Sequence, residues 1–252
     1  MSEFSVEIFP LDFGFKEGIS CIRIGHVLSP EIMDCVIAGS NGLLKIVRWM
    51  TDQHQWVIQQ EFDLTENGGL WNLELWDING DHLDEIIVGG IQGAVVILSG
   101  RGEEIWSQRF TGAITGLKIW PYNSLQDHNG SSRLPRLIVF SLDKTLRVFD
   151  HTGKLLWAQM FSDGVSTVDI TDCDQDGKEE VIAGGNDGTL RIFDGENGKI
   201  KWFKELGANI RAILCLNTKI ICGGDDRKIS LFDGQSQQLL QSRSFPAYIW
   251  FI

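Results

Sequence analysis

The sequence predicts an all-β fold, a β-propeller of four-stranded antiparallel blades, from a repeat, its spacing and its turn. Each copy of the repeat is an apolar run, a tight turn rich in Gly, and a second apolar run. Copies spaced by roughly 40–50 residues are typical of propeller blades. The copies read EIIVGGIQGAVVILSG from Glu85, RLIVFSLDKTLRVFD from Arg136, EVIAGGNDGTLRIFD from Glu180, KIICGGDDRKISLFD from Lys219 and, more loosely, CVIAGSNGLLKIVRW from Cys35.

Aligning the copies on their turns divides the chain into five recognisable blades. The alignment treats Gly39, Gly89, Phe140, Gly184 and Gly223 as equivalent, between 39 and 51 residues apart. We therefore expect a single propeller domain over residues 1–252. Its blades lie at 15–63, 64–110, 111–161, 162–207 and 208–245, flanked by terminal strands at 3–10 and 246–252.

Each blade is expected to hold four strands, lettered a to d from the propeller axis outward. The apolar strands a are Ile19–Ile24, Leu70–Trp76, Ile114–Trp120, Val165–Ile170 and Ile210–Leu216. Strands b and c form the repeated hairpin, whose Asn-Gly and Asp-Gly turns supply positive φ angles. Strand d carries Trp56, Trp106, Trp157 and Trp202, with Leu240 at that position in the fifth blade. A large side chain in successive blades is expected to fill the wedge between them.

The two ends of the chain predict an unfinished ring. Ala247–Ile252 aligns with the start of another strand a, and Ser5–Phe9 is extended and apolar like a strand d. A blade built from both ends lacks its two middle strands, and open sheet edges are a liability. We expect five blades plus an incomplete sixth, as in a fragment or in a subunit that another chain finishes. The alternative is a small five-bladed ring whose termini pair at one seam.

Charge and composition narrow the classes of partner. A net charge of −12 disfavours nucleic acid, which needs a basic surface, and anionic membranes. No apolar stretch reaches the roughly 18–20 residues that span a bilayer, so no membrane insertion is expected. The N-terminus lacks the basic and apolar regions of a secretory signal. The five cysteines show no CxxC spacing, and we interpret them as reduced thiols of a cytoplasmic protein.

Two loops between strands a and b, Asp77–Glu85 and Asp172–Glu180, carry oxygen side chains at alternating positions. Such oxygens can turn toward one point, and Ca²⁺ takes six to eight of them at about 2.3–2.6 Å. The alternative is a plain turn, because Asp, Asn and Gly all favour turns. The predicted ligands of a structural Ca²⁺ are Asp77, Asn79, Asp81, Glu85 and the Leu83 carbonyl in the first loop, and Asp172, Asp174, Asp176, Glu180 and the Lys178 carbonyl in the second.

The second acidic loop and its strand, DCDQDGKEEVIAGG, resemble the FG-GAP repeat of integrin α-subunit propellers, whereas the first loop has His82 where that family has Gly. The hairpins DHTGKLLW from Asp150 and DGENGKIKW from Asp194 are similar to the turns of quinoprotein-type (PQQ-like, WD40-like) propellers, which include non-enzymatic assembly scaffolds. The mixture of both features also resembles the propellers of BBSome subunits. The resemblance covers nearly the whole chain and implies a repeat type rather than one activity.

No converging set of catalytic residues is visible in the sequence. Its five His residues lie in different loops, and it has neither a G-x-S-x-G elbow nor a P-loop. We therefore expect a non-catalytic scaffold that binds other proteins within a larger complex, without a small-molecule ligand. The polar segment Pro121–Pro135 is a candidate contact loop. The alternative is a propeller that binds a small molecule or carbohydrate, or a propeller enzyme.

Overall fold

The computed structural model describes residues 13–121 and 134–250, and these residues fold almost entirely into β-strands. The predicted strand at 3–10, most of the loop Pro121–Pro135 and residues 251–252 lie outside the described residues. The described residues contain one helix, the 3₁₀ helix η1 (Thr65–Asn67). Nothing in this part of the chain forms a helix long and apolar enough to cross a membrane.

Twenty strands form five antiparallel sheets of four, each sheet a blade whose strands follow chain order. The sheets are β1 (Ile19–Gly25), β2 (Asp34–Gly39), β3 (Leu43–Met50) and β4 (Gln55–Asp63); β5 (Leu70–Trp76), β6 (Glu85–Gly90), β7 (Ala94–Leu98) and β8 (Glu104–Arg109); β9 (Ile114–Trp120), β10 (Arg136–Ser141), β11 (Thr145–Phe149) and β12 (Leu155–Met160); β13 (Val165–Thr171), β14 (Glu180–Gly185), β15 (Thr189–Asp194) and β16 (Ile200–Glu205); β17 (Ile210–Leu216), β18 (Lys219–Gly224), β19 (Lys228–Asp233) and β20 (Leu239–Ser244). The five sheets of four confirm the predicted blades, and the inner strands begin where predicted, with β1 and β13 ending one residue later.

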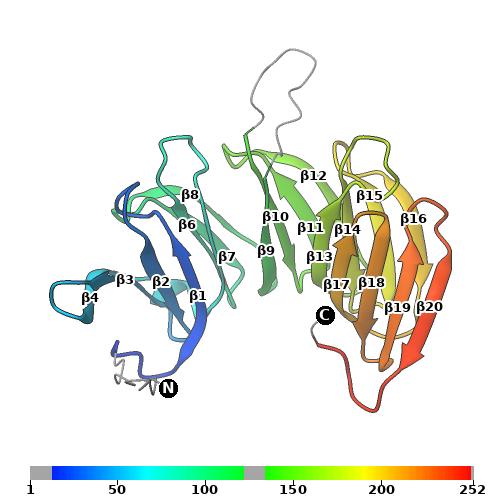
Figure 1. Ribbon diagram of the computed structural model, residues 1–252, viewed down its shortest axis with the longest axis horizontal. Helices are drawn as coiled ribbons and strands as arrows, with labels where there is room; N and C mark the ends of the chain where they lie inside the picture. The colour runs from blue at the N-terminus through cyan, green and yellow to red at the C-terminus, as the bar shows by residue number, and fades with distance from the viewer. Residues whose placement is uncertain (1–12, 122–133, 251–252) are drawn as a thin grey trace, which may run out of the picture.

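The five blades stand side by side in an arc, with the first strand of each blade innermost (Figure 1). Successive inner strands contact one another: β1 contacts β5, β5 contacts β9, β9 contacts β13, and β13 contacts β17. Among the described residues, β17 and β1 lack such contacts, so the blue first sheet and the orange-red fifth sheet end the arc (Figure 1). The middle strands of each inner blade, such as β6 and β14, are buried on both faces, as their unbroken Val and Ile runs predict.

The strand register corrects three predicted equivalences. Ala38 pairs with Cys21 on β1 as Gly89 pairs with Asn72 on β5, so Ala38 and not Gly39 is the counterpart of Gly89. Gln241 pairs with Leu231 as Trp202 pairs with Ile192, so Gln241 and not Leu240 takes the Trp position of the fifth blade. In the first blade Gln60 pairs with Ile46 in the same way, so Gln60 and not Trp56 takes that position. The first error arises because the first repeat has one Gly where most others have two.

The recurring Trp residues lie between blades, as expected for three of the four. The ring of Trp106 lies 5.3 Å from that of Phe149 in the next blade. Trp202 lies 5.7 Å from Phe232 in the same way, and Trp157 lies 6.1 Å from Phe193. Such aromatic pairs stabilise by about 0.5–1.5 kcal/mol beyond their buried area. Trp56 instead packs edge-on against Trp49 of its own blade, 5.7 Å away.

Hydrogen bonds between inner strands also join the blades. The hydroxyls of Ser20, Thr115 and Ser166 donate to the first carbonyl of the next inner strand, on Leu70, Val165 and Ile210 respectively. In the second blade the Asn72 amide donates to the Ile114 carbonyl at 2.9 Å. These polar side chains near the axis thus hold neighbouring blades together at a defined spacing.

The b–c turn of the third blade holds a lysine where the first, second and fourth blades have Gly and the fifth has Arg227. Lys144 has a φ of 72°, and Gly188 at the same place has a φ of 74°. A left-handed backbone costs a residue with a Cβ about 1–2 kcal/mol. Gly avoids that cost, but it loses more conformational entropy on folding, which offsets about half of the gain. We expect Lys144→Gly to raise the free energy of unfolding by about 0.5–1 kcal/mol in urea denaturation.

Gly188→Lys is the matched control for Lys144→Gly, and it should destabilise. A Cβ at Gly188 would lie 2.9 Å from the backbone N of Ala208, which adds a steric cost to the strained φ. If Lys144→Gly were instead destabilising, contacts of the lysine side chain would outweigh its backbone strain.

The C-terminal segment differs from the prediction. Residues 246–250 form no strand, whereas a strand over 246–252 was expected. The amide N–H of Ile249 donates to the carbonyl of Gly224, the last residue of β18, at 3.1 Å, and this hydrogen bond holds the segment against the fifth blade. A strand ladder needs a second strand alongside it, and none is present among the described residues.

Candidate functional site

The two acidic loops connect the inner strand to the second strand in blades 2 and 4. Asp77–Glu85 runs from the end of β5 into β6, and Asp172–Glu180 runs from β13 into β14. Glu85 and Glu180 are the first residues of their strands and are buried. Their carboxylates accept hydrogen bonds from the amides of Ile78 and Cys173, at 2.7 and 3.0 Å, which pull both loops inward.

The first loop is a series of carboxylate-to-backbone hydrogen bonds. Asp77 accepts from the amides of Gly80 at 2.6 Å and of His82 at 2.9 Å. Asp81 accepts from the Leu83 amide at 2.8 Å, and the Asn79 amide group donates to Glu85 at 2.9 Å. His82 adopts a φ of 69°, so it occupies the left-handed position that the integrin-type repeat gives to Gly.

The second loop repeats this pattern and gathers three carboxylates. Asp172 accepts from the amides of Asp176 and Gly177, and Asp176 accepts from that of Lys178. One oxygen from each of Asp172, Asp174 and Asp176 lies within 4.8 Å of the others. Carboxylates this close repel one another unless a cation or a proton lies between them.

A lysine from the outer strand of the same blade provides that cation. The Nζ of Lys201 on β16 lies 2.6 Å from Asp174, 2.9 Å from Glu180 and 3.3 Å from Asp176. Partial burial works against its charge, but hydrogen bonds with Asp174 and Glu180 raise the pKa of Lys201 above its usual range. The oxygen set therefore fits a cation, and an ammonium group already lies among these oxygens.

The first loop has no such lysine. The residue at the place of Lys201 is Ile105 on β8, one position before Trp106, and it is exposed. Burial raises the pKa of Glu85 to about 7, and the charges of Asp81 and Asp77 add to the rise. Burial also raises the pKa of Glu180, but Lys201 counters it there. The carboxylates of the first loop are thus balanced by the Asn79 amide and by backbone amides.

The structure brings together most of the predicted ligands of each loop. Asp174, Asp176 and Glu180 meet at Lys201, with Asp172 beside them, and Asp77, Asn79, Asp81 and Glu85 form one hydrogen-bonded set. Leu83 and Lys178 donate their amides to Asp81 and Asp176. Coordination by their carbonyl oxygens, and by the loops as a whole, stays a prediction.

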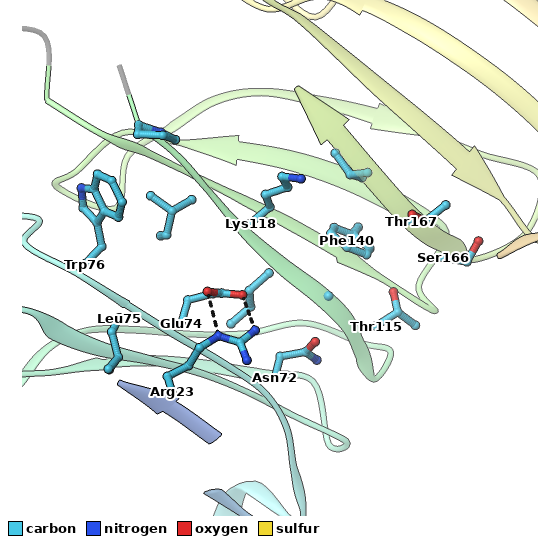
Figure 2. Close-up of a pocket in the computed structure, with 15 residues that line it drawn as sticks. Arg23, Asn72, Glu74, Leu75, Trp76, Thr115, Lys118, Phe140, Ser166 and Thr167 are labelled. Atoms are coloured by element: carbon cyan, nitrogen blue, oxygen red, sulfur yellow. Dashed lines mark hydrogen bonds and ion pairs between the residues drawn. The ribbon is translucent and has the colours of Figure 1, made fainter. Parts of the chain in front are cut away.

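A second polar site lines the propeller axis. One position of the inner strand, opposite the third residue of the second strand, holds Arg23, Glu74, Lys118, Asp169 and Leu214 in successive blades. Arg23 pairs with Glu74 at 2.9 Å, as Figure 2 shows, and Lys118 pairs with Asp169 at 2.5 Å. Neighbouring blades thus contribute charges of alternating sign.

These inner strands line an open cavity of about 570 Å³, and the residues around it include Asn72, Thr115, Phe140 and Thr167 (Figure 2). That size suits a small molecule. The charged groups that line it are paired across blades rather than aimed at one point. Among the described residues that line it, this arrangement offers polar contacts, and none of them is a nucleophile hydrogen-bonded to a base.

Sequence reasoning missed both Lys201 and the axial charges. Lys201 lies 21 positions beyond Glu180, and only the strand register brings the two together. The axial position was detectable in principle, because aligning the inner strands places four charged residues in one column. Each of them alone resembles an ordinary surface charge.

The family profile described as the lambda-carrageenase β-propeller domain matches residues 136–248, from β10 to beyond β20. The chain has a β-propeller fold. The repeat analysis, the five sheets and this match agree on it. A comparison with curated proteins finds no match.

Solved structures with the same fold are numerous and diverse, and 1504 chains match, so the fold alone does not select a function. The computationally designed Ika8 protein is 18% identical with a TM-score of 0.68, covering 92% of this chain and 64% of its own. BBS1N, solved in complex with ARL6DN, is 13% identical with a TM-score of 0.68, and the match covers 91% of this chain and 69% of BBS1N. Saccharomyces cerevisiae Sqt1 is 15% identical with a TM-score of 0.69, and the match covers 86% of this chain and 62% of Sqt1. The chain spans about two thirds of these proteins.

Proposed function

We propose that this propeller is a non-catalytic interaction scaffold that binds other proteins as a subunit of a larger assembly. The observation that carries the proposal is the outer strand of each blade, which is a sheet edge and exposes apolar side chains. The exposed residues are Ile58 on β4, Ile105 on β8, Leu155 and Met160 on β12, Ile200 and Phe203 on β16, and Leu239 and Leu240 on β20. Edges that are both apolar and unpaired accept strands or apolar surfaces of other chains.

The strongest such spot bridges blades 3 and 4. Met160 is 70% exposed and Phe203 is 57% exposed. Arg191 links them, because its guanidinium donates to the Met160 carbonyl at 2.8 Å and its backbone pairs with Phe203. Apolar side chains around an arginine are the composition that protein interfaces favour.

Three further observations support the scaffold or its place in the cytoplasm. BBS1N, which shares this fold, was solved in complex with ARL6DN, so a propeller of this shape can present a protein-binding surface. The five cysteines are free, which agrees with a reducing compartment. Paired rather than convergent charges at the axis favour binding over catalysis.

The acidic loops are proposed to have a structural role in this scaffold. The first loop would hold Ca²⁺ with Asp77, Asn79, Asp81 and Glu85, clamping the turn onto β6. Since a ligand that binds only the folded state stabilises it, Ca²⁺ should raise the melting temperature and EGTA should lower it. An unchanged melting temperature in both conditions would contradict calcium binding.

The interaction proposal is tested by capture with matched variants. Tagged wild type, Met160→Lys and Phe203→Lys are expressed in cells, captured and compared by quantitative mass spectrometry. We expect wild type to capture a protein partner in stoichiometric amount and both lysine variants to lose it. A lysine at an apolar contact would have to give up its hydration when the partner binds, which costs free energy. Leu155→Lys, at the far end of β12, is the matched control. Equal recovery with every variant would contradict an interaction at this spot.

A carbohydrate ligand is the second candidate. It is favoured by the family profile named after a lambda-carrageenase and by the 570 Å³ axial cavity. Incubation with lambda-carrageenan and a panel of glycans, read by thermal shift and by release of reducing ends, tests it. A shift that Glu74→Gln abolishes would place the sugar at the axis and would oppose the scaffold proposal.

A further inference from the structure

The outer strand of the third blade is less protected at its free edge than the other outer strands. Ala158 and Met160 of β12 are exposed and apolar, and Met160 is 70% exposed. The strand register gives the residues at the same two positions of the other outer strands: Glu61 and Asp63 on β4, Ser107 and Arg109 on β8, Phe203 and Glu205 on β16, and Ser242 and Ser244 on β20. Charged side chains protect sheet edges from other strands. Among the five outer strands, β12 alone is apolar at both positions.

The backbone of β12 points away from the sheet at these two residues. The amide N–H of Phe161 donates to the carbonyl of Lys144, next to β11, at 2.8 Å, and successive residues of a strand face opposite neighbours. Met160 and Ala158 therefore present their N–H and C=O groups outward. The Met160 carbonyl agrees with this direction, because it accepts from Arg191 of the next blade at 2.8 Å and keeps a second lone pair. An added strand could pair with all of these groups.

An antiparallel pair of β12 strands about a twofold axis at Gln159 uses all of these groups. In that register Ala158 lies opposite Met160 of a second copy, and Met160 lies opposite its Ala158. Each such pair exchanges two hydrogen bonds and packs a long flexible side chain against a small one. Gln159 meets its own copy at the axis, where an uncharged amide that both donates and accepts avoids repulsion between like charges. The edge of β12 is thus complementary to itself.

The charges at the two ends of β12 match this arrangement. Lys154 precedes the strand and Asp163 follows it, and both are exposed. Antiparallel pairing places the beginning of one strand beside the end of the other, so each Lys154 comes near Asp163 of the second copy. Opposite charges at both ends favour the antiparallel orientation over the parallel one.

We propose that β12 binds β12 of a second copy of this chain, so that two four-stranded sheets join into one continuous sheet. The contact is isologous, since both copies contribute the same residues. The inference rests on the proposed function, because it names the occupant of the Met160 side of the interaction spot and leaves Phe203 on β16 for another protein. One edge strand makes a small contact beside the about 1,200–2,000 Å² of a standard interface, so we expect an affinity in the micromolar range.

Sedimentation equilibrium of the whole protein tests this pairing. We expect wild type to dimerise, and Ala158→Pro to raise the dissociation constant at least about tenfold, because proline removes an outward N–H that the strand's own sheet does not use. Ser107→Pro, at the same position of β8, is the matched control and should dimerise as wild type does. Circular dichroism checks that both proline variants fold. A wild type that stays monomeric well above the micromolar range, or equal dimerisation by Ala158→Pro, would overturn the proposal.

Disulfide formation tests the register without a proline. At the twofold axis the two Gln159 residues would form a non-hydrogen-bonded pair with Cα atoms about 4.5 Å apart, which a disulfide can span. Gln159→Cys should therefore form a covalent dimer with oxidised glutathione. Gln108→Cys, at the same position of β8, should form no more than wild type, which carries the natural cysteines. Equal yields from Gln159→Cys and Gln108→Cys would overturn this register and the pairing with it.

One further variant separates the dimer from the proposed scaffold function. Phe203→Lys lies on β16, outside the paired edge, and should dimerise as wild type does. If β12 does not self-associate while Phe203→Lys still loses its captured partner, the dimer fails and the scaffold function stands. A different protein that occupies β12 would be lost from the capture experiment with Ala158→Pro while purified wild type stays monomeric, and that result would also overturn the dimer.

Discussion

Replacing Lys201 with Met is expected to destabilise the calcium-free protein and to strengthen its affinity for Ca²⁺. Without the ammonium, the buried Glu180 carboxylate loses its 2.9 Å ion pair and the aspartates repel one another. Removing one partner of a buried pair costs about 3–5 kcal/mol, and the partial exposure of Lys201 and Asp176 reduces the expected loss to about 1–3 kcal/mol. Urea denaturation with EGTA measures this loss.

Calcium binding by the same variant provides the second measurement. Because the ion no longer competes with a tethered cation, we expect its affinity for the second loop to rise at least about tenfold, or roughly 1.4 kcal/mol. Isothermal titration calorimetry measures that rise. Ile105→Lys is the matched control, since it introduces a lysine at the same place beside the first loop. An unchanged affinity in Lys201→Met would show that Asp172–Glu180 is a turn and not a metal site.

The pair Gly116 and Phe140 is expected to show the largest loss of stability on a single substitution. They face each other across β9 and β10 and reverse the usual arrangement, in which the Gly lies on the second strand, as in Thr167 opposite Gly184. Phe140 is buried, so Phe140→Gly should lower the free energy of unfolding by about 3–5 kcal/mol through the cavity it leaves.

The opposite substitution tests the same contact from the other side. A Cβ on Gly116 would lie 1.9 Å from the Phe140 ring, so Gly116→Thr should cost about 1–3 kcal/mol through overpacking. The double variant restores the arrangement of the fourth blade. It should therefore lose less than the sum of the single variants, by about 0.5–3 kcal/mol. Strictly additive losses in a double-mutant cycle would mean that the two residues do not compensate each other.

The repeat allowed the fold to be predicted because each blade encodes itself locally. The apolar runs from Glu85 and Glu180 are buried on both faces, and their turns carry the required Gly, so composition and periodicity agree. Register was harder to predict. Ala38 was passed over for Gly39 because an alignment on glycines ignores Asp34, which begins β2 as Glu85 begins β6.

The candidate site was predicted where its residues are close in sequence and missed where they are not. The oxygens of Asp172–Glu180 follow one another along a loop, so their convergence could be expected. Lys201 arrives from the outer strand of the sheet, and its contact depends on how β14, β15 and β16 pair. Likewise Arg23 and Glu74 meet only because two blades stand side by side. Contacts between elements depend on tertiary geometry, which local patterns do not encode.

The alternating charges of the inner strands have a consequence for long-range electrostatics. Arg23, Glu74, Lys118 and Asp169 sum to zero, although the whole chain carries −12. The excess negative charge therefore lies outside this column of inner-strand residues, which is itself neutral. An electrostatic field directs diffusing partners toward the surfaces that generate it. Basic proteins would thus be drawn to the outside of the arc, while the axis would select what enters it by shape and hydrogen bonding.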